Sequence, residues 1–341
     1  MRAVHTIWTK PATYKVKKKW FQESTDSIYT TRSVNNKYFM KDFELLTLVV
    51  SALFYKKYSG KIDLYTDDIG YEYFKEQKVL DFYDDVNVDV LNKFDSIRPD
   101  IYWAAGKVKV IQSQTEPFIS LDTDAVIYDN VEKYVNKKDP LVGFHYEMFG
   151  NEFYPFRDGI KTSDKYEWDE NLNWDLFPVN VAITYFGDDI IRHYYTSECL
   201  RFMKENSDYI KKDYSVKSRM LFAEQRLLPM MCDKFGKEYK TILEGIWNPD
   251  LGTWMHTRHS KVKKLWGTIF THLWSEKVIL RKDKFKEIDY CKNMISTIRS
   301  LDFDGKIYDK VKTIPQLYKF TEFFYWWKKV LDSYIILYVY S

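Results

Sequence analysis

Residues 117–130 read PFISLDTDAVIYDN, and this stretch decides the fold. Apolar residues dominate on both sides of Asp122 and Asp124, as in a strand that is buried on both faces. Because an unpaired charge is costly to bury, two carboxylates at the end of such a strand indicate a bound cation. Hard divalent ions take oxygen ligands and also suit phosphate oxygens supplied by a substrate. The other interpretation is an Asp-rich turn with both side chains in water, which the flanking apolar runs disfavour.

The residues before this stretch alternate between strand and helix patterns. A strand at 3–9, a helix at 37–58 and a strand at 61–68 predict a parallel βαβ unit with a right-handed crossover. A third strand at 86–91 and a helix at 99–114 then lead the chain into the acidic strand. The acidic pair therefore falls beyond the carboxyl end of a strand, where open α/β sheets bind ligands.

The second half of the chain is predicted from the same patterns. The segment 150–174 is polar and aromatic with little periodicity, and a long excursion of this kind is usually functional or mobile. A helix within 222–236 is expected to be interrupted, or to end, near Pro229. Strands are expected at 141–145, 177–187 and 268–270, and a helix at 188–206.

Composition and charge narrow the class of protein. With 52 basic and 49 acidic residues among 341, the net charge of +3 gives no general case for nucleic acid as a partner. Cys199, Cys232 and Cys291 lack CxxC spacing, so a disulfide framework or a zinc site is not expected. We expect a cytoplasmic protein, since neither a signal peptide nor a run long enough to span a membrane is apparent.

Two segments mix lysines with aromatic residues. The run YKVKKKW at 14–20 is either a solvated run of charged residues or a segment that attracts anionic phosphates or lipid. Residues 319–341 are predicted to form a terminal helix with a dense aromatic face. That helix either docks on the rest of the chain or makes a peripheral contact with the inner surface of a membrane.

The order of these features resembles that of nucleotide-sugar glycosyltransferases of the GT-A fold, of the glycogenin-like or capsular polysaccharide type. The shared features are an N-terminal βαβ half, a DxD strand, an acidic-Gln pair at Glu224 and Gln225, and a late His-Lys pair at His272 and Lys277. The resemblance covers roughly residues 3–280 and implies an α/β fold with a mixed, mostly parallel central sheet flanked by helices. It further implies a catalytic domain at 1–282, divided into a nucleotide-sugar-binding half (1–130) and an acceptor half (131–282), and a helical extension at 283–341.

The resemblance also implies a metal site. Asp122, Asp124 and His272 would hold Mn²⁺ or Mg²⁺ against the diphosphate of the donor, and Lys277 would contact that diphosphate. The spacing from His272 to Lys277 is one residue shorter than in the glycogenin-like group, and the Gly expected between them is missing. His256 and His259 are competing ligands.

Further residues are candidates for donor binding and catalysis. Thr9, Asp67 and Lys107 are expected to contact the donor, as is Asp122. Asp67 and Asp68 end the second predicted strand. The alternative interpretation is that both belong to a polar strand-to-helix loop and have no role in binding. Glu224 and Gln225 are expected beside the anomeric carbon, and Asn180 on the acceptor side. Val181 stands where the family has a small residue after the Asn.

The resulting hypothesis is a metal-dependent transferase that moves a sugar from a nucleoside-diphosphate sugar to a glycan or lipid-linked acceptor. The resemblance favours retention of configuration, and the enzyme would be of the hexosyltransferase type and serve polysaccharide biosynthesis. One alternative is a haloacid-dehalogenase-type phosphatase with Asp122 as nucleophile, although that family carries its motif on the first strand. Another is a non-catalytic glycan-binding protein on the same scaffold.

Overall fold

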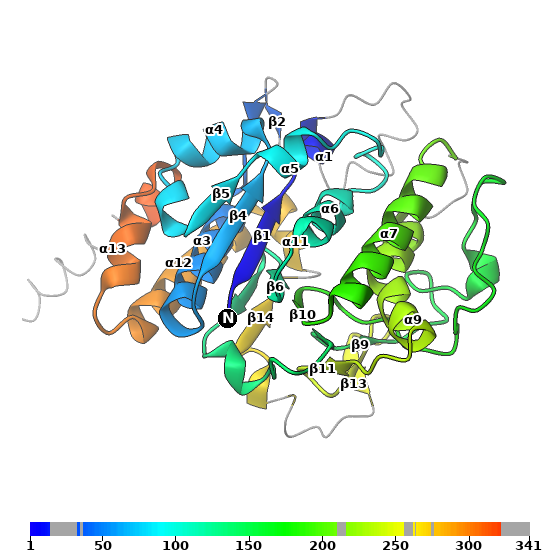
Figure 1. The fold of residues 1–341 in the computed structure, drawn as a ribbon. Helices are drawn as coiled ribbons and strands as arrows, with labels where there is room; N and C mark the ends of the chain where they lie inside the picture. The colour runs from blue at the N-terminus through cyan, green and yellow to red at the C-terminus, as the bar shows by residue number, and fades with distance from the viewer. Residues whose placement is uncertain are drawn as a thin grey trace, which may run out of the picture.

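A computed structural model of the protein describes residues 1–13, 33–34, 37–209, 216–255, 262, 264–273 and 276–321. Its centre is a seven-stranded sheet in the order β11-β8-β10-β6-β1-β4-β5 (Figure 1). Strands β5, β4, β1 and β6 run parallel, β10 is antiparallel to both of its neighbours, and β11 is parallel to β8. The strands are β1 (Ala3–Ile7), β4 (Ile62–Thr66), β5 (Asp85–Asn87), β6 (Phe118–Leu121), β8 (Leu141–Gly143), β10 (Ile183–Phe186) and β11 (Lys240–Thr241).

Helices cover both faces of this sheet, and the apolar residues on the two faces of the sheet belong to two separate cores. In β1, Ala3 and Ile7 belong to the core that contains α3, whereas Val4 belongs to the core that contains α6 and α7, as does Trp8 just after the strand. The helices of the first face are α3 (Asp42–Tyr58), α12 (Lys284–Leu301) and α13 (Lys306–Lys312), and those of the second are α6 (Ala105–Ser113), α7 (Asp189–Glu205) and α9 (Leu227–Lys234) (Figure 1).

The prediction of a mixed, mostly parallel central sheet flanked by helices, with a helical extension at its C-terminal end, is therefore confirmed. The extension packs onto α3, which is buried along most of its length because apolar residues surround it on every side. The pairing of Arg281 with Glu44 adds a charged contact between α11 (Glu276–Lys282) and α3. The terminal helix predicted at 319–341 lies almost wholly outside the described residues, which end at 321.

Smaller elements complete the described chain. A three-stranded sheet joins β13 (Thr253–Met255), β12 (Ile246–Asn248) and β9 (Tyr146–Glu147), and β14 (Phe270–His272) pairs with β7 (Ala125–Ile127). Within the described ranges, no helix combines the length and the apolar character needed to cross a membrane. The remaining elements are α1 (Lys10–Thr13), β2 (Ser33–Val34), β3 (Lys37–Tyr38), α4 (Asp68–Glu76), η1 (Leu80–Phe82), α5 (Asp89–Asn92), η2 (Val131–Lys133), η3 (Arg157–Gly159), α8 (Val216–Leu221), η4 (Phe222–Arg226) and η5 (Pro315–Leu317).

Several elements are shorter than predicted, and the helix expected at 37–58 begins at Asp42, after the short strand β3. In three other elements a side-chain bond lies at or just before the observed boundary. The strand expected at 86–91 stops at Asn87, whose side-chain oxygen accepts from the N–H of Val90 and starts α5. The helix expected at 99–114 begins only at Ala105, after a turn in which the side chain of Arg98 bonds Asp100. The strand expected at 177–187 begins at Ile183, after Asn180 has bonded the N–H of Ala182 with its side-chain oxygen.

Candidate active site

The two aspartates lie in the turn that joins β6 to β7. The N–H of Asp122 donates to the carbonyl of Ala182 (2.7 Å), and the N–H of Ala125 donates back to the carbonyl of Asp122 (3.0 Å). Both flanking strands are fully buried, whereas both aspartate side chains are only partly buried. From the sequence, a turn and a cation site were alternatives. In the structure the two aspartates lie in a turn, and their side chains also converge with that of His272.

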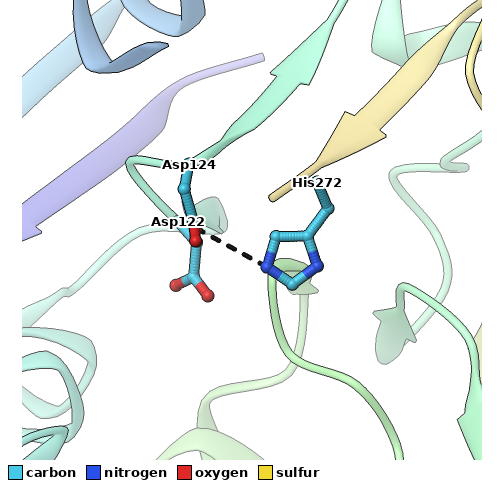
Figure 2. A group of neighbouring side chains, drawn as sticks. All are labelled: Asp122, Asp124 and His272. Atoms are coloured by element: carbon cyan, nitrogen blue, oxygen red, sulfur yellow. Dashed lines mark ion pairs between the residues drawn. The ribbon is translucent and has the colours of Figure 1, made fainter. Parts of the chain in front are cut away.

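His272 reaches this turn through the pairing of β14 with β7. The register places His272 opposite Ala125, and the N–H of Leu273 donates to the carbonyl of Asp124 (3.0 Å). The imidazole Nε2 consequently lies 3.5 Å from Oδ1 of Asp124 (Figure 2). One ligand atom from each of Asp122, Asp124 and His272 lies within 4.8 Å of the others, so the three side chains predicted to bind a metal are brought together.

Two lysines flank the aspartates from different helices. Nζ of Lys107, on α6, lies 2.5 Å from Oδ1 of Asp122, and it also contacts Oε1 of Glu224 and the carbonyl of Val181, each at 3.0 Å. Lys277, in the first turn of α11, pairs with Oδ2 of Asp124. The structure thus brings Lys107, Lys277 and Glu224 to the same acidic cluster.

Burial and charge act in opposite directions on these groups. Burial tends to raise the pKa of Asp124, but the positive charge of Lys277 and the contact with His272 outweigh it and hold that pKa well below its usual range. Burial raises the pKa of Glu224, although Lys107 opposes the rise. Burial tends to lower the pKa of Lys107, but Asp122 and Glu224 raise it on balance, so this lysine stays charged.

The cluster fits a divalent cation. Three carboxylates (Asp122, Asp124 and Glu224) face two lysines, which leaves one formal negative charge for a cation to neutralise. Two carboxylates and one imidazole suit a hard or borderline ion such as Mg²⁺ or Mn²⁺. The buried Nδ1 of His272 has no hydrogen-bond partner among the described residues, so no bond through that atom fixes the tautomer of the ring.

Glu224 and Gln225 lie in η4, a π-helical turn between α8 and α9. An interruption was predicted near Pro229 and is found in this turn, but the helix does not end there, because α9 continues to Lys234. Short π-helical turns often mark functional sites. The side-chain oxygen of Gln225 accepts from the hydroxyl of Tyr154 (2.5 Å), which belongs to the long excursion at 150–174.

Asn180 directly precedes Val181, whose carbonyl Lys107 contacts, but the side chain of Asn180 is not bonded to the acidic cluster. Its side-chain amide donates to Oε1 of Glu147 (3.0 Å), and both residues are buried. Sequence reasoning missed Glu147. The only sequence signal was its position two residues beyond the strand predicted at 141–145, because its partner Asn180 lies 33 residues further along the chain.

Thr9 and Asp67 lie at the carboxyl ends of β1 and β4 and bond each other. The carboxylate of Asp67 accepts from the backbone N–H and the hydroxyl of Thr9, both at 2.8 Å, and from the N–H of Gly70 at the start of α4. Asp67 is therefore the N-cap of α4. A contact of either residue with a donor stays a prediction. The competing ligands His256 and His259, and the basic run at 14–20, lie outside the described residues.

Glu147 gives a prediction about stability and pH. Burial raises its pKa from an ordinary value of 4.5 to about 8, although the amide of Asn180 opposes the rise. Between pH 4.5 and about pH 8, Glu147 is ionised in the unfolded chain but keeps its proton in the folded protein. Its contribution to the free energy of unfolding therefore falls as pH rises, by at most about 1.4 kcal/mol per pH unit. Glu147→Gln should remove this part of the pH dependence, as measured by urea unfolding across that range.

The control is Glu152→Gln, which changes an exposed glutamate five positions further along. We expect that control to keep the pH dependence of the parent protein. A Glu147→Gln protein whose free energy of unfolding still falls with pH as in the parent would show that Glu147 is ionised in the folded state.

Comparisons with known proteins place the chain in one family. No curated protein matches it. Among solved structures, the apo form of mouse xyloside xylosyltransferase 1 is similar over 70% of this chain and 84% of that chain, at 10% identity and a TM-score of 0.34. An active-site mutant of LgtC is similar over 71% of this chain and 72% of that chain, also at 10% identity and a TM-score of 0.34. A family model described as "Family of unknown function (DUF6734)" matches residues 1–299, and the chain therefore belongs to that family.

Proposed function

We propose that the protein is a metal-dependent glycosyltransferase that moves a sugar from a nucleoside-diphosphate sugar to a glycan or lipid-linked acceptor. The observation that supports this most strongly is the convergence of Asp122, Asp124 and His272 at one point, with Lys107 and Lys277 beside them. A cation and lysines side by side are suited to a diphosphate, which brings several negative charges.

In this proposal, Asp122, Asp124 and His272 hold Mn²⁺ or Mg²⁺. The bound ion would neutralise charge on the donor's phosphates and make the nucleoside diphosphate a better leaving group. Lys277 is paired with Asp124, and a cation at that carboxylate would release its ammonium group toward a phosphate oxygen. Lys107 keeps Asp122 and Glu224 close together without a direct clash of their charges.

Glu224 and Gln225 would act next to the reacting carbon. If the sugar keeps its configuration, Gln225 and Glu224 shield the face opposite the acceptor. If the configuration inverts, Glu224 is the general base that takes the proton of the acceptor hydroxyl. We favour retention, and Asn180 would then face the acceptor side. Burial of Glu224 beside Lys107 gives it the kind of perturbed environment that catalytic carboxylates often have.

A thermal-shift screen of nucleoside diphosphates, each with and without Mn²⁺, tests the proposal. One nucleoside diphosphate should raise the Tm in a metal-dependent manner, because a ligand that binds only the folded state stabilises it. The corresponding nucleotide sugars should then be hydrolysed slowly without an acceptor. Absence of any metal-dependent shift, together with turnover of a generic phosphate ester, would instead support a phosphatase with Asp122 as nucleophile.

A further inference from the structure

A proline removes one of the backbone donors that the π-helical turn η4 would otherwise have. The N–H of Leu227 donates to the carbonyl of Phe222, five residues back, which is the π-helical pattern. In the same pattern the carbonyl of Glu224 would be bonded by the N–H of residue 229, but residue 229 is proline and has no N–H. A buried carbonyl without a donor is costly, so this turn needs donors from elsewhere in the fold.

Helix α7 supplies those donors. The hydroxyl of Tyr195 donates to the carbonyl of Glu224 (2.5 Å), and the thiol of Cys199 donates to the carbonyl of Ala223 (2.7 Å). Tyr195 and Cys199 are four residues apart and therefore lie on one face of α7, and both are buried. The N–H of Val179 adds a bond to the carbonyl of Gln225 (3.2 Å).

These backbone bonds determine where the side chain of Glu224 can lie. That side chain contacts Nζ of Lys107, which in turn contacts Asp122. If the turn changed to the regular α-helical pattern, its residues would rotate about the helix axis, and the carboxylate of Glu224 would leave Lys107. Tyr195 therefore acts on Glu224 through the backbone.

We propose that Tyr195 and Cys199 are positioning residues, in which Tyr195 replaces the amide hydrogen that Pro229 lacks and both hold Glu224 against Lys107 for sugar transfer. This inference rests on the proposed function of the site. It adds two residues of α7 to those that matter for the reaction, although α7 contributes none of the three side chains predicted to bind the metal.

The main experiment compares Tyr195→Phe with Tyr185→Phe. Tyr185 is equally buried, and its hydroxyl donates to the carbonyl of Lys137, in a turn that precedes β8 and lies outside η4. In Tyr195→Phe we expect kcat to fall by about a hundredfold, the effect of misplacing a reacting group by about 1 Å, with little change in the donor KM. Hydrogen exchange at the amides of 222–227 should become faster in Tyr195→Phe than in Tyr185→Phe.

A second set of variants tests Cys199 and remains informative if Tyr195→Phe folds poorly. Cys199→Ser keeps a donor and should retain kcat, whereas Cys199→Ala removes the donor and should lower it. The matched control is Cys232→Ala, at a free thiol that is just as buried on α9. A loss in Cys199→Ala that Cys199→Ser restores identifies the hydrogen bond, rather than the volume of the side chain, as the cause.

The readouts separate the two hypotheses. If the parent protein transfers no sugar, the proposed function fails, but the exchange measurement still tests whether α7 holds the turn. Equal exchange rates at 222–227 in Tyr195→Phe and Tyr185→Phe overturn the positioning role, whatever the activity. Faster exchange with an unchanged kcat in an active enzyme overturns it as well.

Discussion

If the proposed function holds, Asp124→Asn is expected to abolish metal-dependent hydrolysis of a nucleoside-diphosphate sugar. Asp124 contacts both His272 and Lys277. Replacing it with Asn therefore removes the negative charge of a proposed metal ligand and also the ion-pair partner of Lys277. We expect kcat to fall by at least about a hundredfold, as when one stabilising group is removed from an active site. The Mn²⁺-dependent rise in Tm with the cognate nucleoside diphosphate should disappear with it.

The control for Asp124→Asn is Asp129→Asn. Asp129 lies just beyond the end of β7 and is bonded to Lys133 and Tyr134, so its substitution changes the same charge without touching the cluster. Both variants should show far-UV circular dichroism like that of the parent. Unchanged turnover or an unchanged Mn²⁺ response in folded Asp124→Asn would remove the basis of the metal site.

Lys107→Met should cause the largest loss of stability among single substitutions at the site. Lys107 separates the carboxylates of Asp122 and Glu224, and removing it leaves two like charges facing each other in a largely buried place. Breaking a buried pair in this way typically costs about 3–5 kcal/mol. Because the side chain of Asp122 is 30% exposed, we expect a value near the lower end of that range.

Urea unfolding of Lys107→Met and Lys109→Met measures this effect. Lys109 is on the same helix and bonds Gln112 within that helix, so Lys109→Met should change the free energy of unfolding only slightly. The loss in Lys107→Met should shrink when the pH is low enough to protonate the two carboxylates. Equal stability of the two variants at neutral pH would show that Lys107 does not hold the carboxylates together.

The fold was largely predictable from the sequence because its central strands are short segments rich in apolar residues. The strands β1, β4 and β6 and the helix α3 all lie within predicted segments, since burial on both faces of a sheet leaves a clear local pattern. Some of the boundaries that differed were decided by single side chains. Asn87 ended a strand, and Asn180 delayed the start of another, through bonds that hydrophobic periodicity does not report.

The candidate site was predictable only in part. Asp122 and Asp124 stand out locally, but the convergence of His272 depends on the register of β14 against β7, and it was predicted from a family resemblance. The contact of Lys107 depends on close packing of α6 against β1. A side chain at Gly106 would lie 2.6 Å from the Cβ of Trp8, so the helix can come this near only with glycine there.

Glu147 and the π-helical turn were not predictable for the same reason. A buried glutamate looks like a surface residue in the sequence, because its burial depends on the amide of Asn180, contributed by a distant segment. Pro229 gave a local signal of a break in the helix. The form of that break depends on Tyr195 and Cys199 of α7, which no local pattern connects with it.

The pairing of β7 with β14 has a consequence for biosynthesis. A nascent chain emerging from the ribosome carries both aspartates long before it carries the histidine and the lysine of the following helix. N-terminal segments generally begin to fold during synthesis, and loops that bring distant segments together close later. The cluster of Asp122, Asp124 and His272 can therefore assemble only after most of the polypeptide has been made.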